Sequence, residues 1–307
     1  MITPIPRDAA IGKSRGKFLV SSSDPITGAT ERVGWHAVNV SANDVATSGI
    51  MPTAITVVAL FHENASAAEI SSTMDEVNQT AKDLGISVLS NQTLRTSNLK
   101  KPIVTVTAFG TGDNFVTSSG ARAGDSILIT KTAGIEGTSI LSRVPAIAKL
   151  VDPETIVRGR KLLDKLSILK ETDVAFKTGK VHAMHDLTEG GVVGCTLEIS
   201  LASKLGFELY ADRIPLDEST KTICAKIHID PLKLIGSGSL LITCNPDDSE
   251  SIIGRLSGED IPCAEIGELR DLSFGRWIVS DGKRQELTDL SVQDELWVAL
   301  GKYGDLS

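Results

Sequence analysis

The stretch that constrains this chain most is residues 24–49, which opens with Asp24-Pro-Ile-Thr-Gly. In its second half, Asp44 is the only charged side chain between positions 34 and 49. A third carboxylate, Asp8, lies upstream. Carboxylates repel one another and resist burial, so a group of them drawn from separate segments usually surrounds a cation. The pattern predicts a metal site of Asp8, Asp24 and Asp44, with Mg²⁺ carrying a nucleotide phosphate as the first candidate.

Residues 35–48 are predicted to form a helix whose small apolar side chains follow helical spacing. The other side carries His36, Asn39 and Asn43, with Asp44 beside them. The segment contains no Lys, Arg or Glu, so it lacks an ordinary solvated face and should be packed on most sides. Buried polar groups need partners. Two interpretations stay open: a hydrogen-bond network within the core, or contact with a metal or substrate.

Composition restricts the class of protein. The chain has 307 residues, of which 41% are hydrophobic and 23% charged, and this length suits two domains of ordinary size. The formal net charge of -8 argues against nucleic acid or an anionic membrane as a main partner, because phosphate backbones require clustered Lys and Arg. One bound nucleotide is compatible with this charge, since a metal can offset its phosphates locally.

Several common features are absent from the sequence. No apolar run reaches the ~20 residues that span a bilayer, and the N-terminal residues do not resemble a signal peptide. We therefore expect a cytoplasmic protein with no membrane partner. The four cysteines form no C-x-x-C pair and lie among small or apolar neighbours, so we expect buried, reduced side chains.

Strand and helix patterns run through both halves of the chain, which predicts mixed α/β or α+β layers. Between residues 110 and 124 the chain is rich in Gly, Ser and other breakers. We place the domain boundary there, with domains at 1–117 and 118–307. The predicted strands are 17–21, 53–61, 86–90, 103–109, 126–130, 181–184, 207–210, 239–243, 265–267 and 277–279. The predicted helices outside residues 35–48 are 65–84, 190–205, 216–227 and 249–256, and helical patterns also continue from the turn at residues 134–138 through about residue 176. Residues 24–27 are predicted to form a turn.

A glycine-rich turn in the second half is a candidate ligand site. His185-Asp-Leu-Thr-Glu-Gly-Gly follows a predicted strand and opens a predicted helix. Asp186 would lie at the carboxyl end of the strand, where α/β sheets place ligands. Gly190 and Gly191 allow close backbone approach, and their N–H groups could hold an anion. A structural helix cap explains the same pattern equally well.

Familiar catalytic signatures do not occur. There is no P-loop and no G-x-G-x-x-G, so phosphate binding would rely on magnesium and a few basic side chains. His182 and His185 should point to opposite faces of their strand, which argues against a two-histidine zinc site. The sequence gives no indication of covalent catalysis.

Taken in order, the motifs resemble those of the AIR synthase-related superfamily, closest to its hydrogenase maturation (HypE-like) branch. The resemblance covers nearly the whole chain and is specific as an ordered set. The matching segments are Asp24-Pro-Ile-Thr-Gly, Ala42-Asn-Asp-Val-Ala with Gly49-Ile-Met-Pro, Gly124-Asp, Lys131-Thr-Ala-Gly-Ile-Glu-Gly-Thr, His185-Asp-Leu-Thr-Glu-Gly-Gly and Asp230-Pro-Leu-Lys-Leu-Ile-Gly-Ser-Gly.

This resemblance implies an N-terminal α/β domain that forms a homodimer, a C-terminal α+β domain, and ATP held with Mg²⁺ in a cleft. It further implies ATP-driven activation of an acceptor or phosphoryl transfer. Carried over by position, the metal ligands are Asp8, Asp24 and Asp44. The residues implied to contact ATP are Asn43, Asn91, Thr93, Asp186, Gly190 and Gly191.

Three departures from the family pattern affect the expected chemistry. The chain begins close to its first acidic motif, so the usual glycine-rich N-terminal arm is short or absent. The strand-end motif reads Ser90-Asn-Gln-Thr-Leu, which offers oxygens with less charge for magnesium. Hydrogenase maturation relatives end in a cysteine, whereas the last cysteine here is Cys263.

The sequence is therefore compatible with three functions. The first is an ATP-dependent, Mg²⁺-dependent enzyme that acts on an unknown small acceptor. The second is a non-catalytic homologue that serves as a dimeric maturation or scaffolding partner of another protein. A lesser alternative resembles thiamine-monophosphate kinase, whose aspartate-rich turn is not matched by the segment that begins at His185.

Overall fold

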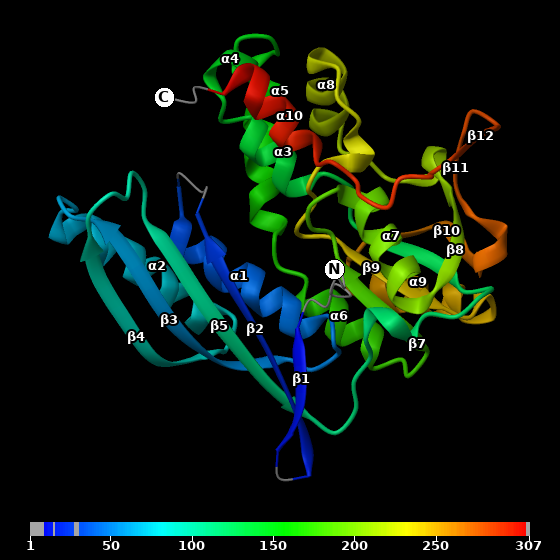
Figure 1. Ribbon diagram of the computed structural model, residues 1–307, viewed down its shortest axis with the longest axis horizontal. Helices are drawn as coiled ribbons and strands as arrows, with labels where there is room; N and C mark the ends of the chain where they lie inside the picture. The colour runs from blue at the N-terminus through cyan, green and yellow to red at the C-terminus, as the bar shows by residue number, and fades with distance from the viewer. Residues whose placement is uncertain (1–8, 15, 28–30, 305–307) are drawn as a thin grey trace. The chain divides into compact units, whose positions relative to one another are not determined.

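The computed structural model describes residues 9–304 except 15 and 28–30. Within this range the chain divides into two compact units, one that ends at Phe115 and one that begins at Val116 (Figure 1). Both units combine helices with a mixed sheet, as predicted for the fold class.

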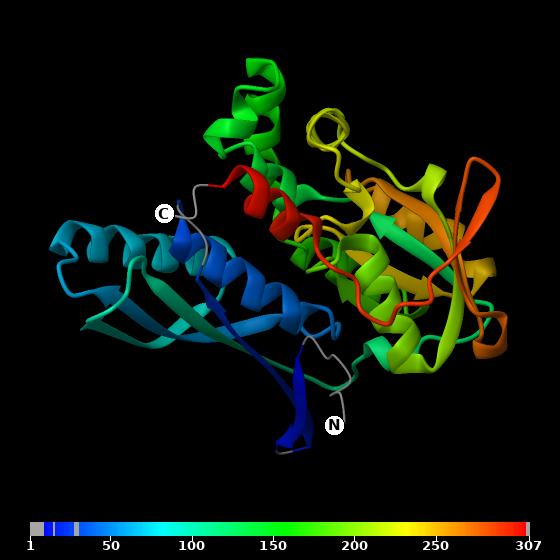
Figure 2. The ribbon, with the colours of Figure 1, turned by 45° about the horizontal axis from the view of Figure 1, so that its top comes forward.

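The N-terminal unit is a five-stranded sheet in the order β1-β2-β5-β3-β4, with two helices on one face (Figure 2). Among the described strands of this unit, only the β3–β4 pair is parallel. The bounds are β1 (Ala10–Ser14), β2 (Lys17–Ile26), α1 (Val33–Ala46), β3 (Pro52–His62), α2 (Ala67–Asp83), β4 (Ser87–Thr96) and β5 (Ile103–Gly112).

Local chemistry explains both helices of this unit. The hydroxyl of Ser66 accepts the backbone N–H of Glu69, an N-cap that starts α2. The first turn of α1 packs closely on α2: a Cβ at Gly34 would collide with the backbone carbonyl of Thr73, so only glycine fits there. Most of α1 is buried, as its lack of Lys, Arg and Glu predicted.

The C-terminal unit is a seven-stranded sheet in the order β12-β11-β8-β10-β6-β9-β7. Its strands are β6 (Ser126–Thr130), β7 (Val181–Asp186), β8 (Leu205–Tyr210), β9 (Leu240–Cys244), β10 (Cys263–Asp271), β11 (Arg276–Ser280) and β12 (Lys283–Glu286). Its α-helices are α3 (Ile135–Leu141), α4 (Pro145–Ala148), α5 (Pro153–Lys161), α6 (Leu169–Phe176), α7 (Gly191–Ser203), α8 (Glu218–Ile227), α9 (Pro246–Ser257) and α10 (Glu295–Tyr303).

The central strand β6 is buried on both faces, which explains its continuous apolar sequence. Ile127 and Ile129 pack with residues of α7 in one hydrophobic cluster. Leu128 points the other way, into a second cluster that includes residues of α6 and α9. The sheet of this unit is therefore a middle layer between helices.

Two predicted boundaries were wrong in ways that concern the site. Asp24 lies inside β2, paired with Val106 of β5, and not in a turn. Asn91 lies inside β4, which continues to Thr96, and not at a strand end. The polar residues of both strands have weak β propensity, and pairing with neighbouring strands compensates for it. The predicted elements also omitted β1, β12 and α10. In the described part of the chain, no helix is long and apolar enough to cross a membrane.

Candidate functional site

The N-terminal unit brings two of the predicted metal ligands together. The hydroxyl of Ser22 lies 2.9 Å from Asp24 Oδ2 and 2.7 Å from Asp44 Oδ2. A hydroxyl carries one hydrogen, so Ser22 can donate to only one of these carboxylates at a time. Two carboxylates and a hydroxyl at this spacing are the hard oxygen donors that Mg²⁺ prefers. We call Ser22, Asp24 and Asp44 the acidic centre.

Strand and helix geometry produce the acidic centre. Ser22 and Asp24 are two positions apart on β2, so both side chains point to the same face of the sheet, the face that α1 covers. Asp44 faces them from α1 and is only 7% exposed. Asn43, the neighbouring predicted ATP contact, is fully buried. Asp8, the third predicted metal ligand, lies outside the described residues.

Other polar groups of α1 serve the core. Asn39 donates from Nδ2 to the carbonyl of Trp35, 2.9 Å away. Ser41 donates from Oγ to the carbonyl of Val106 on β5, also 2.9 Å away. For Asn39 the structure thus supports the interpretation of a hydrogen-bond network within the fold.

Asn91 and Thr93 lie at some distance from that centre, on the edge strand β4. The register aligns Asn91 with Val57, Val57 with Val106, and Val106 with Asp24. Asn91 is therefore in the same row as Asp24, three strand spacings or about 14 Å away. That distance is too long for one ion to bind both, although an extended ligand could follow the row. Both Asn91 and Thr93 are exposed.

The second predicted group belongs to the C-terminal unit. Asp186 is the last residue of β7 and is 1% exposed. Gly190 and Gly191 have φ angles of 81° and 59°, in the left-handed region that favours glycine. A Cβ at Gly191 would also collide with the backbone of Leu232 and Leu234, so this turn requires glycine for space as well.

The backbone N–H groups of this turn have partners within the chain. Gly190 donates to Asp294 Oδ2 at 2.6 Å, and Gly191 donates to the carbonyl of Thr188 at 3.1 Å. Asp294 also accepts the backbone N–H of Leu296 and so caps α10. Burial raises the pKa of the Asp294 carboxyl, and its backbone hydrogen bonds oppose that effect. Of the two donors that were expected to hold an anion, Gly190 thus binds a carboxylate of the protein itself and Gly191 binds a backbone carbonyl.

Sequence reasoning missed Asp294 because its partner Gly190 is 104 residues away. It also gave no role to Lys131, which follows β6 with a φ of 54°. Lys131 Nζ lies 2.7 Å from Glu171 Oε1 and donates to the carbonyls of Lys165 and Ser167. Burial lowers the pKa of Lys131, against the opposing effect of Glu171. The sequence pattern that could have identified Lys131 is its place at the end of a strand, directly before Thr-Ala-Gly.

Comparison with known proteins agrees with this architecture. The model of the AIR synthase related protein N-terminal domain matches residues 6–111, and that of the C-terminal domain matches residues 122–276. The chain belongs to the AIR synthase-related family.

Curated relatives include a protein of Methanocaldococcus jannaschii named "Putative hydrogenase expression/formation protein". It is 23% identical over 221 residues, 71% of this chain and 64% of the relative, so the chain spans less than two thirds of that protein. The carbamoyl dehydratase HypE of Cupriavidus necator is 25% identical over 272 residues, 85% of this chain and 76% of HypE.

Solved structures share the fold. HypE in a HypE–HypF complex superposes with a TM-score of 0.77 at 21% identity, covering 92% of each chain. HypE in complex with ATP gives 0.74 at 20% identity, covering 91% of this chain and 86% of that one. The ThiL protein of a structure titled "AaThiL complexed with AMPPCP and TMP" gives 0.74 at 20% identity, covering 93% and 91%.

Proposed function

We propose that this protein binds ATP with Mg²⁺ and uses it to activate, or transfer phosphate to, a small acceptor. The observation that carries the proposal is the acidic centre, where the carboxylates of Asp24 and Asp44 both lie within hydrogen-bonding distance of the Ser22 hydroxyl. Relatives of the same fold were solved with ATP or with an ATP analogue, which supports the choice of nucleotide.

In this proposal Asp24 and Asp44 are the metal ligands of the N-terminal unit, with Asp8 as a third. When bound, Mg²⁺ would neutralise charge on the phosphate groups. Asn43 lies directly beside Asp44 in sequence and is buried, so it would orient that carboxylate or the nucleotide. Asn91 would contact a more distant part of the nucleotide, because it shares the row of Asp24 across the sheet, and Thr93 would do so from the next row, which contains Ile26.

Calorimetry with Mg²⁺-ATP tests the proposal. Wild type should bind one nucleotide per chain, and Asp44→Ala should lose binding because one of two adjacent ligands is removed. Asp75→Ala, an exposed aspartate of α2, is the matched control and should bind as wild type does. Absence of binding in wild type, or unchanged binding in Asp44→Ala, would refute nucleotide binding at the acidic centre.

A homodimer is the assembly that we propose for this enzyme. The sheet face opposite α1 and α2 carries Leu19, Val58 and Leu94, which are 36%, 41% and 54% exposed. Apolar side chains across three strands of one face suit a subunit contact. In light scattering, Val58→Glu should shift wild-type dimers toward monomers, and Leu150→Glu, at a similarly exposed leucine of the other unit, should not. A monomeric wild type would exclude the dimer.

A second candidate is a non-catalytic maturation protein that acts through a partner. It is favoured by the fold it shares with HypE of a HypE–HypF complex and by the uncharged Asn91 and Thr93. Steady-state ATP hydrolysis that disappears in Asp24→Ala would exclude it. Adding thiamine monophosphate to the same assay tests the lesser alternative, a kinase of that acceptor.

A further inference from the structure

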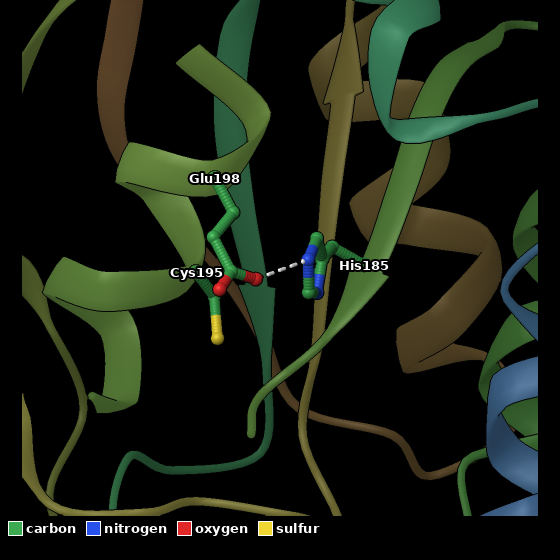
Figure 3. A group of neighbouring side chains, drawn as sticks. All are labelled: His185, Cys195 and Glu198. Carbon is green, nitrogen blue, oxygen red and sulfur yellow. Dashed lines mark ion pairs between the residues drawn. The ribbon is translucent and has the colours of Figure 1, made fainter. Parts of the chain in front are cut away.

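A separate cluster of metal-binding side chains lies in the C-terminal unit, whereas the acidic centre belongs to the N-terminal unit. The potential ligand atoms of three side chains lie within 4.8 Å of one another: His185 of β7, and Cys195 and Glu198 of α7 (Figure 3). His185 and Cys195 are buried, and the Glu198 side chain is 32% exposed. Of the three side chains, only Glu198 is therefore in contact with solvent to an appreciable extent.

Fold geometry produces this cluster. Cys195 and Glu198 are three residues apart on α7, so they share one face of the helix. His185 faces them from the neighbouring strand, whereas His182 contacts Asp125, with its Nδ1 2.9 Å from Asp125 Oδ1. The two histidines therefore have different partners, and His185 is joined by a cysteine and a glutamate instead.

The hydrogen bonds of His185 fix which nitrogen faces the cluster. Its Nδ1 lies 2.7 Å from the carbonyl oxygen of Asp186, and a carbonyl can only accept, so Nδ1 carries a hydrogen. Its Nε2 lies 2.9 Å from Glu198 Oε2. A histidine whose Nδ1 donates to a backbone carbonyl while Nε2 faces a carboxylate has the orientation found in metal ligands.

The sulfur of Cys195 also has a hydrogen bond that bears on metal binding. Its Sγ accepts the backbone N–H of Thr188 at 3.2 Å, a bond that favours a thiolate. Burial raises the pKa of Cys195 well above its usual value, and the charges of Glu198 and Asp186 raise it further. A divalent cation in the cluster would reverse the effect of those charges and displace the thiol proton.

We propose that His185, Cys195 and Glu198 form a three-ligand site for a divalent transition-metal ion of the Zn²⁺ class. One imidazole nitrogen, one thiolate and one carboxylate are the donor types that zinc accepts, and the exposed edge of Glu198 leaves room for water as a fourth ligand. Tetrahedral zinc sets such ligand atoms about 3.3–3.6 Å apart. The Nε2–Oε2 distance of 2.9 Å is shorter than this spacing, so metal binding requires the Glu198 carboxylate to move away from His185.

The competing explanation is an ordinary ion pair, in which a protonated His185 contacts Glu198 and Cys195 merely packs beside them. Zinc titration of the full chain distinguishes the two explanations. Protein freed of metal by a chelator, without nucleotide or Mg²⁺, is titrated with Zn²⁺ against a chromophoric competitor. We expect one tight equivalent in wild type and binding at least about 100-fold weaker in Cys195→Ser, since second-shell changes alone cost 10–100-fold.

Cys224→Ser is the matched control, because Cys224 is equally buried but belongs to a different hydrophobic cluster of this unit. It should bind Zn²⁺ as wild type does. Should Cys195→Ser not fold, the partly exposed Glu198→Gln replaces it and should also weaken binding. Replacing Zn²⁺ by Co²⁺ adds a spectroscopic test: a thiolate-to-cobalt absorption band should appear in wild type and Cys224→Ser only. No tight equivalent in wild type, or the same affinity in the Cys195 and Glu198 variants, overturns the site and leaves the ion pair.

Discussion

The acidic centre and the turn before α7 each involve a buried aspartate, Asp44 and Asp294, but the hydrogen-bond partners of the two differ. At the acidic centre, Asp24 and Asp44 approach the single hydroxyl of Ser22. At the turn, Asp294 alone receives two backbone N–H groups, one on each carboxylate oxygen, from Gly190 and Leu296.

The difference indicates what each region is for. Two carboxylates beside one hydroxyl supply the hard oxygen donors that a cation such as Mg²⁺ binds. The Asp294 carboxylate has a backbone hydrogen-bond donor on each oxygen and needs no ligand, so we expect it to contribute to the stability of the fold. We therefore expect substitutions of Asp24 or Asp44 to change nucleotide binding, and substitutions of Asp294 to change the stability of the protein without ligand.

The largest expected effect is the loss of ligand-dependent stabilisation in Asp44→Asn. At a Mg²⁺-ATP concentration 100 times the Kd, bound ligand stabilises a protein by about 2.7 kcal/mol. Asp44→Asn keeps the shape of the side chain but removes its charge, so most of this stabilisation should disappear. Thermal denaturation with and without Mg²⁺-ATP measures it, and Asp75→Asn should keep the full shift. A full shift in Asp44→Asn would contradict the role of the acidic centre.

Next in size is the destabilisation expected for Asp294→Ala. Hydrogen bonds to charged groups contribute about 1.5–3 kcal/mol, and here the lost acceptor leaves the buried N–H of Gly190 without its partner. The free energy of unfolding without ligand should fall by about 2 kcal/mol, as measured by urea denaturation. Asp289→Ala, at an exposed aspartate of the preceding segment, is the control and should change it little. Equal stability of wild type and Asp294→Ala would show that the turn does not need this carboxylate.

A smaller effect concerns pH. Because burial raises the folded-state pKa of Asp294 above its unfolded value, the native state holds this proton more tightly. The contribution of this group to stability is therefore fully present below the unfolded pKa of about 3.9 and is lost as pH rises through the folded pKa. Subtracting the unfolding free energies of Asp294→Asn from those of wild type between pH 4 and 7 isolates this loss. If this difference, wild type minus Asp294→Asn, rises with pH, then folding lowers the pKa of Asp294 and the prediction is wrong.

The smallest effects are expected at the edge strand. Asn91→Ala and Thr93→Ala each remove one neutral hydrogen-bonding group, about 14 Å from Asp24 for Asn91 and farther for Thr93, which is in the next row. Nucleotide binding should weaken by about 0.5–1.5 kcal/mol, or about 2–10-fold, in calorimetry. Ser87→Ala at the start of the same strand is the control. Losses as large as that of Asp44→Ala would place the centre of the nucleotide site on β4 instead.

The sequence predicted the fold and the burial of α1 because these depend on patterns within short segments. The absence of Lys, Arg and Glu from residues 35–48 was enough to predict a helix without a solvated face. The ordered motifs from Asp24 to Asp230 indicated the family, and the family models confirm it.

The remaining features depend on contacts between distant segments. The extension of β2 through Asp24 comes from pairing with β5, about 80 residues later, and polar Ser22 and Ser23 do not signal a strand. Ser22 had no predicted role because serine is common in loops. Asp294 could have been predicted as the cap of α10 from the apolar pattern after it, but its bond to Gly190 could not.

The bond between Gly190 and Asp294 also has a consequence during translation. The ribosome adds roughly 5–20 residues per second, so the acceptor is made roughly 5–20 s after its donor. During that interval the nascent turn has only water to accept the Gly190 N–H. The C-terminal unit thus reaches its final hydrogen bonding only after most of its sheet has been synthesised, and a ribosome stalled before codon 294 would display the unfinished turn.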